Sequence, residues 1–308
     1  MPRVSVIIPT HSRPQLLLGA IASARAAGSD VEIVVVDDAS VDHTASVCQD
    51  VPNIKYLRVE RNQGVAGARN IGTFESNAPY LAFLDDDDLR LPGSLDLQAE
   101  ALDQNPAAGF VCGAMIIADQ NQQPTGEVIR PRHPGGDAFW QLLELDFPIL
   151  PLSALIRKEC FLRVGLLNRQ IDGIDDWDIF TRIAEVYPVI TMQNPVGIYR
   201  KPTPSSAQGS SAHAFQLRRA TRHQRALFRL ARSAALTTKQ RRAIRRRTID
   251  RVCETLIWSA INEHVPSRRV ATALGNIGTA FLLDPVFATR PGMRAKATSK
   301  IRAQFKPT

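Results

Sequence analysis

Short runs of β-branched and aromatic residues alternate with amphipathic stretches through the first hundred residues. The runs predict strands at 3–8, 31–36, 54–59, 80–84 and, further on, 108–119. Apolar residues at helical spacing predict helices at 15–27, 40–50, 65–76 and 93–105. Because strands that alternate with helices pair in parallel, we expect an α/β fold with a mostly parallel, buried sheet and helices on both faces.

The pattern after residue 119 is less regular. It predicts a helix near 138–145, an apolar run at 147–156 and a helix within 173–190 whose first turn is acidic. Residues 201–211, KPTPSSAQGSS, are rich in Pro, Ser and Gly and are typical of a linker. We therefore predict a catalytic domain at 1–200, a linker at 201–211 and a helical region at 212–308.

The two sides of this linker carry opposite charge. Residues 1–199 hold 15 Lys and Arg against 26 Asp and Glu, whereas residues 200–308 hold 23 against 4. Such a basic region favours an anionic partner, and a membrane surface is our functional hypothesis, with the apolar stretches 254–261 and 279–283 in contact with lipid. The alternative is a set of helices whose arginines simply face solvent. Nucleic acid is disfavoured because no base-reading motif accompanies the arginines.

The cysteines and the lengths of the apolar runs indicate the cellular compartment in which we expect the protein. The four cysteines are scattered without the spacing of a zinc site or a disulfide framework. The apolar run at 4–8 is too short for a signal peptide, and no segment reaches the eighteen or so apolar residues that crossing a membrane needs. We expect a cytoplasmic protein, attached at most peripherally to the inner face of the cell membrane.

Polar loops follow three of the predicted strands. PTHS at 9–12 follows the first strand, DDAS at 37–40 the second, and DDDD at 85–88 the fourth. Ligands of parallel sheets bind beyond the carboxyl ends of the strands, so these loops are expected to converge on one edge. Four adjacent carboxylates repel one another, which predicts a cation beside them.

Five stretches together resemble the inverting family 2 glycosyltransferases of GT-A fold. They are VSVIIPTHSRP, IVVVDDASVD, GVAGARNIG, YLAFLDDDDL and GIDDWDIFTRIAE, and they occur in family order over roughly residues 1–200. The resemblance implies transfer of a sugar from a nucleotide-sugar donor, a UDP-sugar in our interpretation, to a hydroxyl of a glycan or lipid-linked acceptor. It also implies Mg²⁺ or Mn²⁺ as the cofactor.

The resemblance assigns residues to the donor. The D-x-D motif of the family maps to Asp85 and Asp87, which would bind the cation, and Asp86 would lie near the ribose or the metal. Asp38 ends the second strand, where a carboxylate can accept a hydrogen bond from the base. The remaining nucleotide-binding positions are Pro9, His11 and Arg69. His11 stands where the family commonly has an aromatic residue such as tyrosine.

The acceptor hydroxyl must lose a proton as it attacks the anomeric carbon, so a general base is required. By resemblance this base is Asp176, with Asp175 and Trp177 shaping the acceptor side. The lead-in GGFDE of the family is here GLLNR, at residues 165–169, so this chain departs from the family where the acceptor would bind.

Two other classes remain open. Nucleotidyltransfer onto a sugar phosphate uses a similar sheet and metal-bound carboxylates, but usually with a glycine-rich loop after the first strand, and residues 9–15 contain no glycine. A non-catalytic adaptor would bind membrane or nucleic acid through the basic region 212–308.

Overall fold

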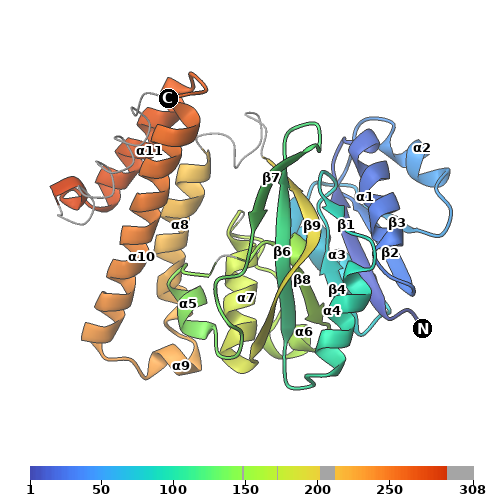
Figure 1. The fold of residues 1–308 in the computed structure, drawn as a ribbon, viewed down its shortest axis with the longest axis horizontal. Coiled ribbons are helices and arrows are strands. Elements are labelled where there is room, and N and C mark those ends of the chain that lie inside the picture. Colours follow the sequence, from blue (N-terminus) through green and yellow to red (C-terminus); the bar gives the residue numbers. More distant parts are fainter. Residues whose placement is uncertain (148, 172, 202–211, 290–308) are drawn as a thin grey trace. The chain divides into compact units, whose positions relative to one another are not determined.

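The computed structural model describes residues 1–147, 149–171, 173–201 and 212–289 (Figure 1). The chain divides into two compact units, Met1–Leu143 with Phe147–Thr203, and Glu144–Asp146 with Pro204–Thr308. Almost all of the predicted linker, 202–211, and the terminal segment 290–308 lie outside the described residues.

Four parallel strands form the first half of the sheet, in the order β3-β2-β1-β4. They are β1 (Val4–Thr10), β2 (Val31–Asp37), β3 (Lys55–Arg58) and β4 (Tyr80–Phe83). The helices that connect them are α1 (Pro14–Ala26), α2 (Thr44–Gln49) and α3 (Gly64–Glu75). The strand and helix alternation predicted for this region is confirmed, although α2 is shorter than the predicted helix at 40–50.

The second half of the sheet is mixed. Its strands are β5 (Leu89–Arg90), β6 (Phe110–Ala118), β7 (Pro124–Ile129), β8 (Ala154–Arg157) and β9 (Val189–Arg200). The whole order is β3-β2-β1-β4-β8-β6-β9-β5, with β7 beside β6. β8 runs antiparallel to both β4 and β6, whereas β6 and β9 are parallel. The parallel pairing that we predicted therefore holds for β1 to β4 and for β6 with β9.

β9 is a long strand that the sequence pattern did not predict. Asn194 and Pro195 interrupt its apolar run, and the register with β6 shifts on either side of Ala114. Gly113 of β6 lies at this irregularity, where a Cβ would collide with the side chain of Val196. The missing side chain lets the two strands stay paired through the shift.

Helices cover both faces of the sheet, as predicted. On one face α1 packs against β1 and β2 and α4 (Ser94–Asp103) packs against β6 and β9, through a buried cluster that includes Leu17, Leu95 and Ile8. On the other face lie α3, α6 (Glu159–Val164) and α7 (Asp175–Val186). There the rings of Phe110 and Phe180 are 5.0 Å apart. Because successive side chains of a strand alternate, β1 contributes to both layers.

Short elements complete the first unit. They are α5 (Phe139–Leu143) and the 3₁₀ turn η1 (Pro151–Ser153).

All four cysteines of the chain, two of which lie on β6 and α6, are buried free thiols, so the prediction that no disulfide forms is confirmed.

The second unit is helical, as predicted for the basic region. Its elements are α8 (Ala212–Leu227), α9 (Ala231–Ala234), α10 (Thr238–Ser259), the π-helical turn η2 (Ala260–His264), α11 (Val270–Leu283) and the 3₁₀ turn η3 (Phe287–Thr289). A capping box of Thr237 and Gln240 starts α10. Cys253 and Leu256 of α10 and Ala280 of α11 form its core. Glu144 belongs to this unit and pairs with Arg251 at 3.0 Å.

Candidate active site

The loops after β1, β2 and β4 meet at one edge of the sheet. The Leu84 amide donates to the Ile7 carbonyl, which carries the β4 loop alongside the end of β1. Thr10 Oγ1 then donates to Asp86 Oδ2 at 2.7 Å. On the other side of β1, His11 Nδ1 lies 2.8 Å from the carbonyl oxygen of Asp38. Parallel register thus brings together residues that are up to 76 positions apart.

The four aspartates after β4 alternate between buried and exposed positions. The side chains of Asp86 and Asp88 are buried, whereas those of Asp85 and Asp87 are 42% and 29% exposed. The two buried carboxylates hold the loop, because Asp88 accepts a hydrogen bond from the Arg200 amide at 2.9 Å and Asp86 is held by Thr10. The two open carboxylates are those that the sequence predicts as metal ligands.

Two arginines from distant parts of the chain form ion pairs with this loop. Arg13 Nη1, just before α1, lies 3.0 Å from Asp86 and 3.2 Å from Asp87. Arg200 at the end of β9 lies 3.5 Å from Asp87. The sequence prediction did not include Arg13 or Arg200 as site residues. Arg13 lies within the quoted stretch VSVIIPTHSRP. Arg200 ends β9, and it was not recognised as a site residue because that strand was not predicted.

Burial and mutual repulsion act on the acidic loop. Burial, and then the neighbouring carboxylates of Asp87 and Asp85, raise the pKa of Asp86 to about 6, against the pull of Arg13. The pKa of Asp87 is also raised, by burial first and then by the charge of Asp85. A cation placed between the open carboxylates would relieve this repulsion.

The donor set at the loop fits a hard divalent cation. Carboxylate oxygens suit Mg²⁺ and Mn²⁺, which commonly bind one or two protein carboxylates and take other ligands from phosphate and water. Within the described ranges, no three His, Cys, Asp or Glu side chains are grouped so as to hold a metal ion. Asp85 and Asp87 could provide two carboxylate ligands for such an ion.

Arg69 connects the acidic loop to α7. It is buried, and its Nη2 lies 2.6 Å from Asp85 while its Nη1 lies 3.5 Å from Asp175. Its guanidinium also lies over the ring of Phe83, 5.6 Å from the centroid. One buried cation thus joins the end of β4 to the start of α7, which are about ninety residues apart in the sequence.

This linkage makes a testable contribution to stability. Replacing Arg69 with Met leaves the buried Asp175 without this cation, and we expect a loss of about 3 kcal/mol in the free energy of unfolding. Urea denaturation followed by circular dichroism measures it. Arg61→Met is the matched control, because Arg61 is exposed in the same unit and its loss is expected to cost less than about 0.5 kcal/mol. Equal midpoints for the two variants would show that the linkage is not structural.

Asp176 lies in the first turn of α7, between two buried residues. It is partly exposed, whereas Asp175 and Trp177 are buried. The indole Nε1 of Trp177 donates to the Leu142 carbonyl at 2.5 Å and so holds α7 against α5. Burial, and then the charge of Asp175, raise the pKa of Asp176 above its usual range. Of these three residues, Asp176 is the one that is partly accessible to solvent.

Asp37 and Asp38 are both buried at the end of β2, where they accept hydrogen bonds from different partners. Asp37 is fully buried and accepts hydrogen bonds from the Ser40 amide and the Tyr56 hydroxyl, so it holds the loop together. Asp38 accepts a hydrogen bond from the Gln63 amide at 2.6 Å. This bond fixes Asp38 beside His11. The sequence did not single out Gln63, which contributes only a backbone group.

The remaining predicted nucleotide-binding positions differ in exposure. Pro9 is buried within β1 and pairs with Val36 of β2, whereas His11 is exposed just after the strand. Pro9 therefore contributes only to the strand, whereas the His11 side chain is accessible at its end.

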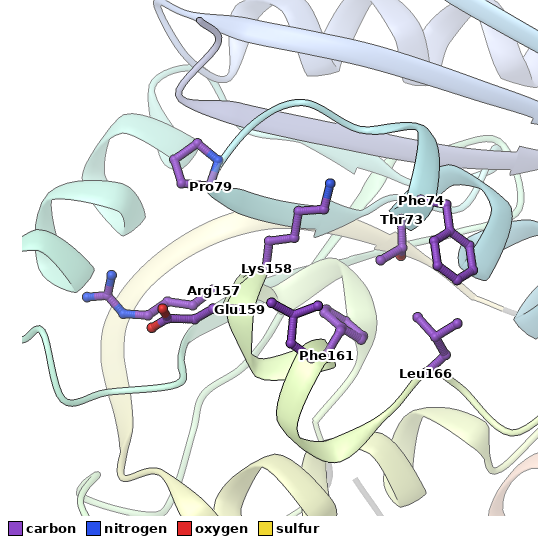
Figure 2. Close-up of a pocket in the computed structure, with 9 residues that line it drawn as sticks. Thr73, Phe74, Pro79, Arg157, Lys158, Glu159, Phe161 and Leu166 are labelled. Atoms are coloured by element: carbon purple, nitrogen blue, oxygen red, sulfur yellow. The ribbon is translucent and has the colours of Figure 1, made fainter.

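An apolar groove of about 590 Å³ lies elsewhere on this unit (Figure 2). Phe74 of α3, Pro79 and Phe161 of α6 are among the residues that line it. Pro79 immediately precedes β4, whereas Asp85 follows that strand, so the groove lies at the opposite edge of the sheet. It takes no part in the acidic site.

The fold defines the class of protein to which this chain belongs. A parallel half-sheet that continues into mixed strands, with an acidic loop after β4, is the arrangement of GT-A glycosyltransferases. The crystal structure of S. aureus TarS 1–349 superposes with a TM-score of 0.63 at 14% identity, over 93% of this chain and 91% of that one. The same protein in complex with UDP-GlcNAc gives a TM-score of 0.65 at 13% identity, over 93% of this chain and 92% of that one.

The sequence identifies the family within this class. The model of glycosyl transferase family 2 matches residues 5–158, and the chain belongs to this family.

Two curated relatives are partial matches. An uncharacterized glycosyltransferase of Haemophilus influenzae is 27% identical over 185 residues, which cover 59% of this chain and 62% of the relative. A GalNAc(5)-diNAcBac-PP-undecaprenol beta-1,3-glucosyltransferase of Campylobacter jejuni is 40% identical over 116 residues, 36% of this chain and 38% of the relative. The chain thus spans less than two thirds of the length of each.

Proposed function

We propose that this protein is an inverting glycosyltransferase that moves a sugar from a UDP-sugar to a hydroxyl of a glycan or lipid-linked acceptor. The observation that carries the proposal is the convergence of the open carboxylates Asp85 and Asp87 with the start of α7 through buried Arg69. Membership of family 2 and the UDP-GlcNAc complex of TarS support the choice of donor.

The donor nucleotide would bind across the ends of β1 and β2. Asp38 accepts a hydrogen bond from the base, and His11 stacks beside it, since both sit at that edge. Mg²⁺ or Mn²⁺, when bound, neutralises the diphosphate as it leaves. Asp85 and Asp87 would hold the ion. Arg13 and Arg200, which pair with Asp87, would each be able to turn to a phosphate oxygen of the donor.

Asp176 acts as the general base in this proposal. Its carboxylate accepts the proton of the acceptor hydroxyl as that oxygen forms a bond to the anomeric carbon. The bond from this carbon to the diphosphate breaks at the opposite face, so the configuration inverts and no covalent enzyme intermediate is needed. Asp175 stays paired with Arg69 and raises the basicity of its neighbour.

The acceptor class is drawn from the Campylobacter relative, whose name describes an acceptor linked to undecaprenol through a diphosphate. An acceptor of that kind would bring the enzyme to the inner face of the cell membrane.

Ligand-dependent thermal stability tests donor binding. UDP with Mn²⁺ should raise the melting temperature, because a ligand at 100 times its dissociation constant stabilises the native state by about 2.7 kcal/mol. The shift should vanish in EDTA, and uridine with Mn²⁺ should give only a small one because it lacks the diphosphate. A UDP shift of equal size with and without metal would contradict the proposed metal site.

A further inference from the structure

Helix α11 exposes an uninterrupted apolar surface. Its fourteen residues, VATALGNIGTAFLL, include no charged side chain. Val270, Leu274, Phe281 and Leu282 are all exposed, the two leucines at 63% and 70%. Val270, Leu274 and Phe281 are spaced by four and seven residues and so lie on one side of the helix, and Leu282 lies next to Phe281 at the end of the helix. We call these four residues the α11 face.

The opposite side of α11 is already packed. Ala273, Asn276 and Ala280 are buried, and Ala280 belongs to the core that α11 shares with α10. Figure 1 shows α11 running beside α10 and α8. The buried side of α11 therefore packs the helix into the unit, and the α11 face makes no contribution to that packing.

Two arginines flank the start of the α11 face, Arg268 and Arg269, which immediately precede the helix. At the other end Asp284 pairs with Arg246 of α10 at 3.1 Å, so its negative charge is neutralised. Residues 212–289 as a whole hold 15 Lys and Arg against 4 Asp and Glu. A second copy of the chain on this face would bring like charge against like charge, whereas an anionic surface would be attracted.

We propose that the α11 face is a membrane-binding surface that inserts into the headgroup region of an anionic bilayer. Its apolar side chains enter the lipid, while the flanking arginines pair with phosphate groups. No helix in the part of the chain that the structure describes is long and apolar enough to cross a bilayer. The contact is thus interfacial, and it requires neither a sugar donor nor an acceptor.

Vesicle binding tests this surface on the full chain without any substrate. The probes are vesicles of phosphatidylcholine alone and of equal parts phosphatidylcholine and phosphatidylglycerol, and binding is measured by co-sedimentation. The wild-type protein should bind the mixed vesicles and leave pure phosphatidylcholine unbound. The double variant Leu274→Glu with Leu282→Glu should weaken binding to the mixed vesicles about tenfold or more, since both leucines leave the lipid.

The matched control is Phe74→Glu with Leu162→Glu. These residues are 71% and 92% exposed in the first unit, so this variant gains the same two negative charges away from α11. It should keep most of the binding, with only the loss due to net charge. Circular dichroism verifies that both variants are folded, and light scattering reports their oligomeric state.

Three results would overturn the proposal. Equal losses in the two double variants would mean that net charge alone drives binding. Equal binding of both vesicle types would remove the role of the arginines. A dimer that the α11 substitutions dissociate, without any vesicle binding by the wild type, would make the α11 face an interface between copies. Since no result depends on catalysis, sugar transfer can fail or succeed independently.

Discussion

Asp176→Asn is expected to lower kcat about 10³-fold, because a positioned general base typically contributes 10²- to 10⁴-fold. The amide has nearly the same shape as the carboxylate, but it cannot accept the acceptor proton. Affinity for the donor should be almost unchanged, because Asp176 lies at the start of α7 whereas the proposed nucleotide site lies across the ends of β1 and β2. Transfer from UDP-sugar to an acceptor, followed at saturating donor, measures the effect.

The pH profile provides an independent reading of the same residue. Since burial and Asp175 raise the pKa of Asp176, the unprotonated base is lost at a higher pH than for a free aspartate, whose pKa is about 4. The wild-type rate should therefore fall as the pH drops through this raised pKa, and the residual rate of Asp176→Asn should lack that fall.

Asp50→Asn controls for the loss of a carboxylate, because Asp50 is exposed after α2 and belongs to none of the loops that form the site. Its rate and profile should match the wild type. Full activity of Asp176→Asn in a folded protein would remove Asp176 from the mechanism.

Asp87→Asn should lower kcat/KM about 10²- to 10³-fold, the equivalent of the several kcal/mol that a bound cation supplies to the departing diphosphate. The substitution removes the more enclosed of the two open carboxylates and also the partner of Arg13 and Arg200. UDP affinity in Mn²⁺ should fall strongly, whereas uridine affinity should not change, because uridine makes no contact with the metal. Isothermal titration with each ligand separates the two.

The outcome that contradicts this assignment is specific. If Asp87→Asn binds UDP as tightly as the wild type in Mn²⁺ and loses that affinity in EDTA, another residue holds the ion. Asp85→Asn then becomes the informative variant, since Asp85 is the second open carboxylate of the loop.

The first hundred residues were predictable because each element there is local. Alternation of buried runs such as 31–36 with amphipathic stretches marks βα units without reference to the rest of the chain. β9 was not predicted because its apolar pattern is interrupted at Asn194 and Pro195. The strand forms because it pairs with β6, whose Gly113 lies at the irregular point. Pairing between strands that are distant in sequence has no local signature.

The candidate site divides in the same way. Motifs identified the acids, since each lies in a short recognisable stretch at a strand or helix end. They did not identify Arg200, which reaches Asp87 from the end of the unpredicted strand. They also did not show which aspartates of DDDD are accessible. In the fold Asp86 and Asp88 are buried, whereas Asp85 and Asp87 are partly exposed.

The sequence by itself determined the order of the βα units, the acidic and basic halves, and the residue types that a metal-assisted transfer needs, because periodicity, charge and motif spacing are properties of the linear chain. Only the tertiary structure decided which carboxylates face solvent, which arginines neutralise them, and that Arg69 brings the start of α7 to the end of β4. These depend on distances between residues up to about a hundred positions apart, which packing sets and no local pattern encodes.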